Sequence, residues 1–279
     1  NSLMRKGIAL LILVITASVN AQVISPTGTP LSQAPAGGMV DRPTIFDSQP
    51  YVEAGITFDQ LTNNRNNWNS QYANLFVPLK ENGFIFASIQ NANRFAVNDQ
   101  GLNLTYAYPF SAGILNIDVG ATVNPQFLPQ ASVGLGWNGK LPENFGYIVS
   151  ANQQKYSDFY FNANTNAYSL GLEKYIDIYR LAYVGTASTV NGTQPGYSSK
   201  IQLQRIDSND NRIGLTGAFG TAPTVLSPGN LSSIQSQYIQ LDGLYWITKN
   251  VGITSAIWFG HEGIYYDRTG FLLGIRTKF

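Results

Sequence analysis

The stretch Thr269-Gly-Phe-Leu-Leu-Gly-Ile-Arg-Thr-Lys-Phe279 alternates between two kinds of side chain along its whole length. One register suits contact with lipid and consists of Phe271, Leu273, Ile275, Thr277 and Phe279. The other register is mostly polar, charged or small. Alternation with a period of two is typical of a β-strand that has different environments on its two faces.

The same alternation continues through the chain from Tyr51 onward. In the first run, Val52, Ala54, Ile56 and Phe58 alternate with Glu53, Gly55, Thr57 and Asp59. The sequence contains about 14 such runs, or about 12 if two weak runs near Ala163 and Gly196 are misread. No segment has helical spacing over three turns. Residues 51–279 are therefore predicted to form an all-β, antiparallel up-and-down transmembrane β-barrel whose last strand pairs with its first. The final strand then resembles the assembly signal of Gram-negative outer-membrane barrels; an edge strand of a soluble sheet is the alternative.

The composition favours a membrane barrel over a soluble domain. Charged residues make up only 12% of the chain, against about 25% in an average soluble domain. Aromatic residues reach 13%, and several near strand ends, such as Tyr51 and Tyr245, are predicted to form interfacial girdles. The net charge of +1 gives no indication of a nucleic-acid partner. The chain has no cysteine, which excludes disulfides, thiolate metal sites and a lipoprotein anchor.

The amino-terminal part is predicted to be a removable signal peptide over residues 1–21. Arg5 and Lys6 precede a short apolar run, and Val19-Asn-Ala21 supplies small residues before a cleavage site. Export through a signal peptide, together with a predicted barrel, indicates the outer membrane of a Gram-negative bacterium. Residues 22–50 are rich in Pro, Gly, Ser and Thr without periodicity, so they are predicted to lie irregularly in the periplasm or as a plug in the barrel mouth.

The predicted connections alternate between short turns and longer loops. Short turns such as Pro142-Glu-Asn144 and Asp207-Ser-Asn-Asp210 carry the residues that tight hairpins need. Between them lie Asn/Pro/Gly-rich connections, among them Ala96–Asp99, Ala222–Ser233 and His261–Asp267. Short turns on one rim and longer loops on the other are typical of outer-membrane barrels.

Charged residues of both signs fall in the inward register. The candidates for lining the lumen are Glu53, Asp59, Arg94, Asp118, Glu173, Arg180, Lys200, Arg212, Asp242, Glu262 and Arg276. Glu173 and Arg180 flank one short turn and are expected to meet across it. These charges either select a polar solute in a wet path or form buried pairs that hold a narrow barrel together.

The sequence predicts no enzyme, no cofactor and no metal site. His261 is the only histidine, and no G-x-S-x-G nucleophile motif accompanies it. A lipid-modifying outer-membrane enzyme that uses His261 is the lesser alternative.

An ordered set of motifs resembles the YaiO family of outer-membrane β-barrel proteins. The set comprises Trp68, Asn93-Arg-Phe95 ahead of Asp99, Pro125-Gln-Phe-Leu-Pro129, Trp137, Leu172-Glu-Lys-Tyr175, Arg212-Ile-Gly214, Ala218-Phe-Gly220 and the segment from Gly270 to Phe279. The resemblance implies a passive channel or an accessory for export or diffusion of a polar or carbohydrate solute. The implied partners are outer-membrane lipid and lipopolysaccharide, the barrel-assembly machinery, and a polysaccharide or small polar solute. A structural barrel whose extracellular loops bind a partner or surface glycan is the alternative function.

Overall fold

The computed structural model describes residues 49–63, 65–79, 83–157, 159 and 161–279. The predicted signal peptide, residues 1–21, lies outside the described residues. So does the predicted irregular segment, except for Gln49 and Pro50. Among the described residues no helix is long and apolar enough to cross a membrane.

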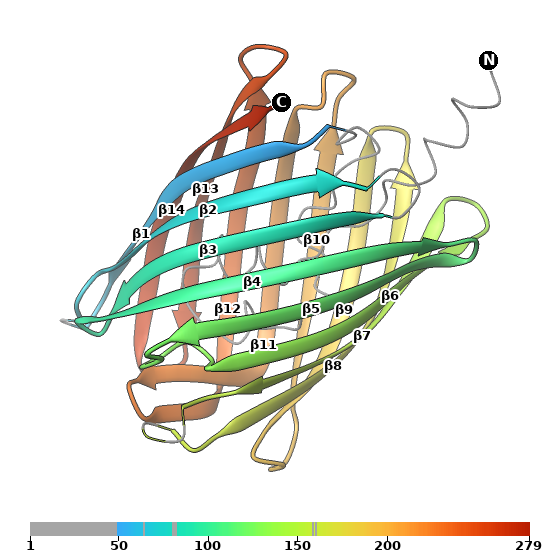
Figure 1. Ribbon diagram of the computed structural model, residues 1–279. Helices are drawn as coiled ribbons and strands as arrows, with labels where there is room; N and C mark the ends of the chain where they lie inside the picture. Colours follow the sequence, from blue (N-terminus) through green and yellow to red (C-terminus); the bar gives the residue numbers. More distant parts are fainter. Residues whose placement is uncertain (1–48, 64, 80–82, 158, 160) are drawn as a thin grey trace, which may run out of the picture.

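Fourteen antiparallel strands close into a single barrel, in which each strand pairs with its neighbours in the chain (Figure 1). The strands are β1 Tyr51–Leu61, β2 Trp68–Pro78, β3 Phe84–Arg94, β4 Val97–Phe110, β5 Gly113–Val123, β6 Ala131–Leu141, β7 Phe145–Lys155, β8 Asn164–Ile176, β9 Tyr179–Val190, β10 Gly196–Ile206, β11 Arg212–Ser227, β12 Asn230–Trp246, β13 Val251–Glu262 and β14 Tyr266–Lys278. The predicted fold class is confirmed. The two weak runs are the complete strands β8 and β10, so the count is 14 and not 12.

The last strand closes the barrel against the first, as predicted. Tyr51 lies opposite Lys278, and the pairing continues without a shift to Leu61 opposite Arg268. The backbone N–H of Phe279 adds a hydrogen bond of 3.1 Å to the carbonyl of Pro50. Every edge of the sheet is therefore paired, as closure into a barrel requires.

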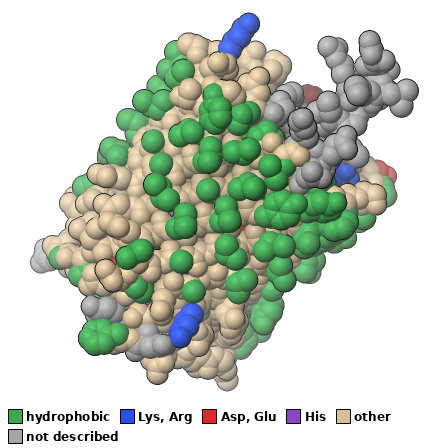
Figure 2. All heavy atoms as spheres, viewed as in Figure 1, with side chains coloured by type: hydrophobic (Ala, Val, Ile, Leu, Met, Phe, Trp, Pro, Cys, Tyr) green, Lys and Arg blue, Asp and Glu red, His purple; other side chains and the backbone are tan. Residues whose placement is uncertain are grey.

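The two faces of the wall differ as the alternation predicts. On β14, Phe271, Leu273 and Ile275 are 43–59% exposed on the outer face, whereas Arg276 on the inner face is 4% exposed. Figure 2 shows apolar side chains spread over the visible outer face and charged side chains mostly near its ends. An apolar outer band with a polar interior is the arrangement of transmembrane barrels.

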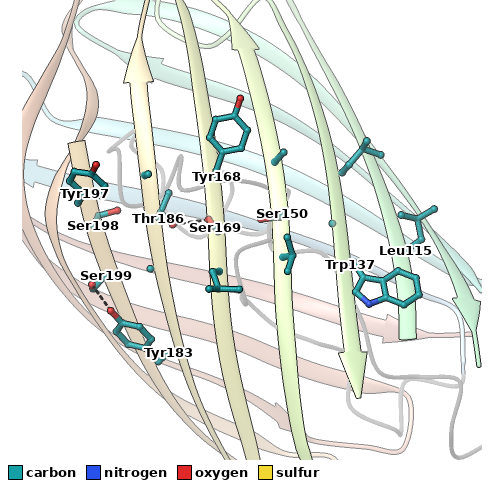
Figure 3. A pocket seen from close by; sticks show the side chains of 17 residues that line it. Leu115, Trp137, Ser150, Tyr168, Ser169, Tyr183, Thr186, Tyr197, Ser198 and Ser199 are labelled. Atoms are coloured by element: carbon teal, nitrogen blue, oxygen red, sulfur yellow. Dashed lines mark hydrogen bonds between the residues drawn. The ribbon is translucent and has the colours of Figure 1, made fainter. Parts of the chain in front are cut away.

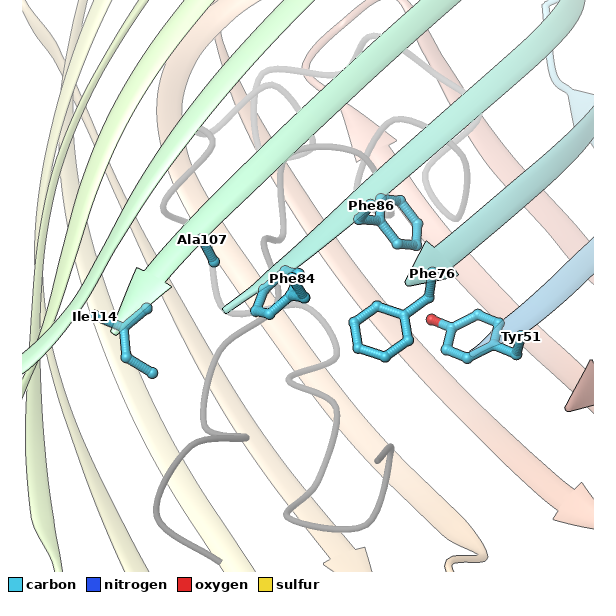
Figure 4. Close-up of a cluster of buried hydrophobic side chains, with 6 residues drawn as sticks. All are labelled: Tyr51, Phe76, Phe84, Phe86, Ala107 and Ile114. Carbon is cyan, nitrogen blue, oxygen red and sulfur yellow. The ribbon is translucent and has the colours of Figure 1, made fainter. Parts of the chain in front are cut away.

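The position predicted for Tyr51 in an outer aromatic girdle is wrong. Its side chain is 2% exposed and stacks on Phe76 on the inner face, with the ring centroids 5.2 Å apart. Phe84, Phe86 and other apolar residues complete this inner cluster (Figure 4). Tyr51 shares the register of Glu53, so its aromatic ring follows the polar face and not the lipid face.

Connections of two to five residues occur at both ends of the barrel, and those longer than five residues lie at one end only. We call the end with both barrel termini the turn end and the opposite end the loop end. At the turn end, Asp207 folds the predicted short turn by accepting hydrogen bonds from the backbone N–H groups of Asn209 (2.8 Å) and Asn211 (3.0 Å). The side chain of Asn211 donates another hydrogen bond of 3.0 Å. This bond is the main reason that the pKa of Asp207 lies below its usual value.

Three of the predicted loops are shorter than expected. Strand β4 begins at Val97, so only Phe95 and Ala96 form the turn that was predicted over Ala96–Asp99. The prediction of a loop over His261–Asp267 is also wrong in extent, because β13 runs to Glu262 and β14 starts at Tyr266. The predicted loop Ala222–Ser233 is instead a two-stranded extension of β11 and β12 around a tight turn at residues 228–229.

Candidate functional site: the barrel lumen and its loop end

The predicted lumen residues all lie on the inner face. Ten of them are at most 9% exposed: Glu53, Asp59, Arg94, Asp118, Glu173, Arg180, Lys200, Arg212, Glu262 and Arg276. Asp242 is partly buried in the same register. This placement follows the alternation of the strands, and contact of these side chains with a solute stays a prediction.

Several of these charges form pairs across neighbouring strands. Glu53 on β1 accepts a hydrogen bond of 2.7 Å from Arg276 Nε on β14. Glu173 accepts one of 3.1 Å from Arg180 Nε, which confirms the pair predicted across the turn between β8 and β9. Arg180 Nη1 also donates to Gln202 at 2.8 Å. Because the paired groups are buried, each partner offsets the desolvation of the other.

At the loop end, aromatic rings and an arginine pack into one cluster, which we call the mouth cluster: Trp68, Arg94, Phe95, Phe127 and Tyr266. Trp68 makes edge-to-face contacts with Phe95 and Tyr266, with centroids 5.2 and 5.6 Å apart. The guanidinium of Arg94 lies 5.1 Å from the ring centroids of both Trp68 and Phe127. Such cation–π contacts suit a buried arginine whose charge is spread over a plane.

Asp99 fastens the loop between β5 and β6 to this cluster. The carboxylate is fully buried and accepts hydrogen bonds from three consecutive backbone N–H groups, those of Gln126, Phe127 and Leu128, at 2.7–3.0 Å. Successive amides around one carboxylate form an anion nest, with the anion supplied by the chain itself. Trp68, Arg94, Asp99 and Phe127 all belong to the motifs of the family resemblance, and the fold brings them together here.

The extension of β11 and β12 turns inward and crosses the loop end. Strand β10 pairs with β11 only as far as Gly220, and β13 pairs with β12 only as far as Ser236. Beyond these residues the hairpin is paired only with itself. Gly220 has a φ of +131°, and a Cβ there would collide with the backbone of Tyr197 and Ser198, so the bend requires glycine. Figure 1 shows the orange hairpin folded across the lower end of the barrel.

The hairpin tip contacts strands on the far side of the barrel. Val225 packs in one cluster with Ala92 of β3 and Phe127, and Leu226 in another with Trp68 of β2. Arg65 Nη1 also donates a hydrogen bond of 3.0 Å to the carbonyl of Leu226. Strands β2 and β3 are not neighbours of β11 in the barrel order. The hairpin therefore spans the mouth and caps it over the mouth cluster.

Beneath this cap, Asp59 connects three strands. It accepts a hydrogen bond of 2.6 Å from Trp258 Nε1 on β13 and lies 3.6 Å from Arg268 Nε on β14. Arg268 is fully buried but is not among the predicted lumen residues. It belongs to the same inward register as Arg276 and lies nearer the cap, so the alternation of the closing strand could have identified it.

His261 lies on the outer face, away from the lumen. Its Nδ1 is 2.5 Å from Asp267 Oδ1, and the two side chains are 49% and 42% exposed. In the part of the chain that the structure describes, the ring makes this carboxylate contact and no hydrogen bond to a serine or threonine hydroxyl. A nucleophile next to the base is what hydrolysis would need. The described residues also contain no group of three acidic or histidine side chains that could hold a metal ion.

Comparison with solved structures identifies the fold. The CymD monoaromatic hydrocarbon channel superposes with a TM-score of 0.58 at 8% identity, over 91% of this chain and 97% of that chain. Omp33 of Acinetobacter baumannii superposes with a TM-score of 0.46 at 14% identity, over 83% of this chain and 98% of that chain. An anion-selective porin of Comamonas acidovorans superposes with a TM-score of 0.45 at 8% identity, over 82% of this chain and 98% of that chain. No family model and no curated protein matches the chain. The superposition on CymD shows that the chain has the fold of outer-membrane β-barrels.

Proposed function

We propose that this protein is an integral outer-membrane barrel, and that it serves as a passive channel or accessory for export or diffusion of a polar or carbohydrate solute. The observation that carries the proposal is the polar inner face, where charges of both signs share the inward register with Ser, Thr, Asn and Gln. Groups of this kind select solutes by hydrogen bonding. The shared fold with the CymD channel is compatible with the proposed channel role and gives no information on the solute of this protein.

In this proposal the loop end is extracellular, since an even number of strands returns both barrel termini to the periplasmic side. The cap over the mouth cluster then makes the channel a gated one. The partners are outer-membrane lipid and lipopolysaccharide, the barrel-assembly machinery and the solute. Cleavage after Ala21, the assembly role of the final strand and membership of the YaiO family stay predictions. An enzyme is not proposed, because among the described residues the ring of His261 contacts the carboxylate of Asp267 and makes no hydrogen bond to a hydroxyl.

Planar-bilayer recordings on refolded protein test the channel. We expect discrete current steps in the wild type and longer open times in Leu226→Asp, because a carboxylate at a position 3% exposed in the cap would displace the hairpin. Ser233→Asp, which places the same charge at an exposed position of the same hairpin, is the matched control.

Circular dichroism confirms the intact barrel in each sample. No current from either the wild type or Leu226→Asp would overturn the channel. Equal open times in the wild type and Leu226→Asp would leave the channel but remove the gating role of the hairpin. Liposome swelling with neutral sugars of increasing size then identifies the solute class.

A further inference from the structure

We propose that the outer wall over β6–β10 holds a specific site for the acyl chain of an outer-leaflet lipid. A groove with a volume of about 800 Å³ crosses these strands (Figure 3). The site lies on the outer face and not in the lumen, so it is separate from the solute path. It rests on the membrane location in the proposed function, but not on conductance.

Two rows of outward side chains border the groove. Cross-strand pairing joins Leu115, Trp137, Val149, Leu170, Gly185 and Ser199 into one row, and Leu135, Ala151, Tyr168, Ala187 and Tyr197 into the other. Between them runs a row whose side chains belong to the inward register: Gly136, Ser150, Ser169, Thr186 and Ser198. The backbone of this middle row therefore forms the floor of the groove.

The groove exists because small residues replace large ones in the outward register. Most outward positions of the barrel carry Leu, Ile, Val, Phe or Tyr. Small outward residues line the groove on β7, β9 and β10, and their short side chains leave the backbone uncovered there: Ala151, Gly185, Ala187 and Ser199. The large side chains Tyr168 and Tyr183 stand beside them (Figure 3), and Leu170 also lines the groove.

The shape selects a flexible chain over a second barrel. The outer wall of a barrel is convex, so another copy cannot fill a hollow that follows the backbone, whereas a hydrocarbon chain can. With strands about 4.8 Å apart, the groove extends about 19 Å from β6 to β10. One leaflet of a bilayer contributes about 15 Å of hydrocarbon, so a lipid chain lying at an angle matches this length.

Two tyrosines of the groove lie toward the loop end, Tyr168 as the fifth residue of β8 and Tyr197 as the second residue of β10 from that end. Leu115, in contrast, is the third residue of β5 from the turn end. The groove is therefore inclined across the wall. Both tyrosine side chains are largely exposed, Tyr168 to 62% and Tyr197 to 67%. Tyrosines at this level suit the interface, where a lipid ester and head group lie, with the chain directed toward Leu115.

Photolabelling with a defined lipid tests the site. The barrel is refolded into phosphatidylcholine vesicles that contain a trace of phosphatidylethanolamine with a diazirine in one acyl chain. Labelled residues are then identified by mass spectrometry. We expect several-fold more label on Val149 and Leu170 than on Leu102 of β4 and Ile239 of β12, which are outward residues away from the groove.

The test variant fills the groove without disturbing the wall. A Cβ at Gly185 would lie 3.8 Å from Tyr183 Oη and 4.0 Å from the carbonyl of Leu170, which is ordinary contact, so Gly185→Leu fits. Gly217→Leu is the matched control, because a Cβ at that outward glycine of β11 meets nothing within 4 Å. Both variants should fold, since leucine restricts the unfolded chain more than glycine does.

Gly185→Leu should reduce the label on Val149 and Leu170 to the level of the reference residues, and Gly217→Leu should leave it unchanged. Even labelling around the wild-type wall would overturn the site, as would equal labelling in Gly185→Leu. A dimer in the bilayer that Gly185→Leu separates would also overturn it in favour of a second copy. Conductance is measured on the same samples, so a failed channel and a failed lipid site are distinguished.

Discussion

Replacing Asp99 by Ala should release the loop between β5 and β6 from the mouth cluster. In the native protein, the Asp99 carboxylate is fully buried and accepts hydrogen bonds from the N–H groups of Gln126, Phe127 and Leu128. Without the carboxylate, three amides lose their acceptor at once. The loop must then open to bring these amides into contact with water.

The magnitude follows from the three hydrogen bonds. Hydrogen bonds to a charged group contribute about 1.5–3 kcal/mol each, and about 1 kcal/mol each is a lower bound once water replaces part of the loss. The free energy of local opening should therefore fall by at least about 3 kcal/mol, which is more than a hundredfold in the opening equilibrium at about 1.4 kcal/mol per tenfold. Amide exchange that proceeds through local opening reports this equilibrium directly.

Hydrogen–deuterium exchange of Phe127 and Leu128 is the assay. Asp99→Asn keeps one acceptor oxygen but no charge, so its exchange should be intermediate. Asn98→Ala is the control, because Asn98 is the exposed neighbour on the opposite face of β4, where its amide donates to Asn91 Oδ1. Exchange at Phe127 and Leu128 that stays at the wild-type rate in Asp99→Ala would refute the anchoring role of the carboxylate.

Three other changes have defined outcomes. Ala96→Gly should raise the free energy of unfolding by about 0.5 kcal/mol net, because the φ of +61° at Ala96 costs a residue with a Cβ about 1–2 kcal/mol, and the greater entropy loss of glycine offsets part of the gain. An unchanged or lower midpoint in urea would contradict this. Arg180→Met should destabilise the barrel by about 3–5 kcal/mol, since the buried carboxylate of Glu173 would lose the guanidinium of Arg180. The double variant with Glu173→Gln should recover much of the loss, and full additivity of the two changes would argue against the pair. The hydrogen bond from Asn211 lowers the pKa of Asp207 in the folded protein below 3.8. The ionised carboxylate therefore stabilises the folded protein above about pH 4, and this stabilisation is lost as the pH falls through the lowered pKa of the folded state. Unfolding midpoints between about pH 5 and pH 2 should show this loss in the wild type but not in Asp207→Asn.

The fold could be predicted because alternation is a local property that each strand repeats. The inward register of the predicted lumen residues follows directly from it, and so does the pairing of Glu173 with Arg180 across one turn. Arg268 is missing from the predicted lumen residues because the closing strand was predicted to begin at Thr269, whereas β14 begins at Tyr266.

The loop end could not be predicted in the same way, because its contacts join distant segments. The residues Ala222–Ser233 have the composition of a loop, with Pro, Ser, Asn and Gly, yet they form strands since the two halves pair with each other. The burial of Val225 and Leu226 depends on β2, β3 and the loop that Asp99 anchors. Composition carries no information on such non-local pairing.

The two ion pairs between β1 and β14 form only when the last strand pairs with the first in the native register. Glu53 and Arg276 are 223 residues apart in sequence, and Asp59 and Arg268 are joined across the same junction. Until the last strand is seated, both carboxylates on β1 lack these partners. A slip of one residue would turn the arginines toward lipid, and a slip of two toward Gly274 would place Glu53 opposite a residue without a charge. A barrel without its last strand, or with either of these slips, therefore carries buried charge that the native register pairs.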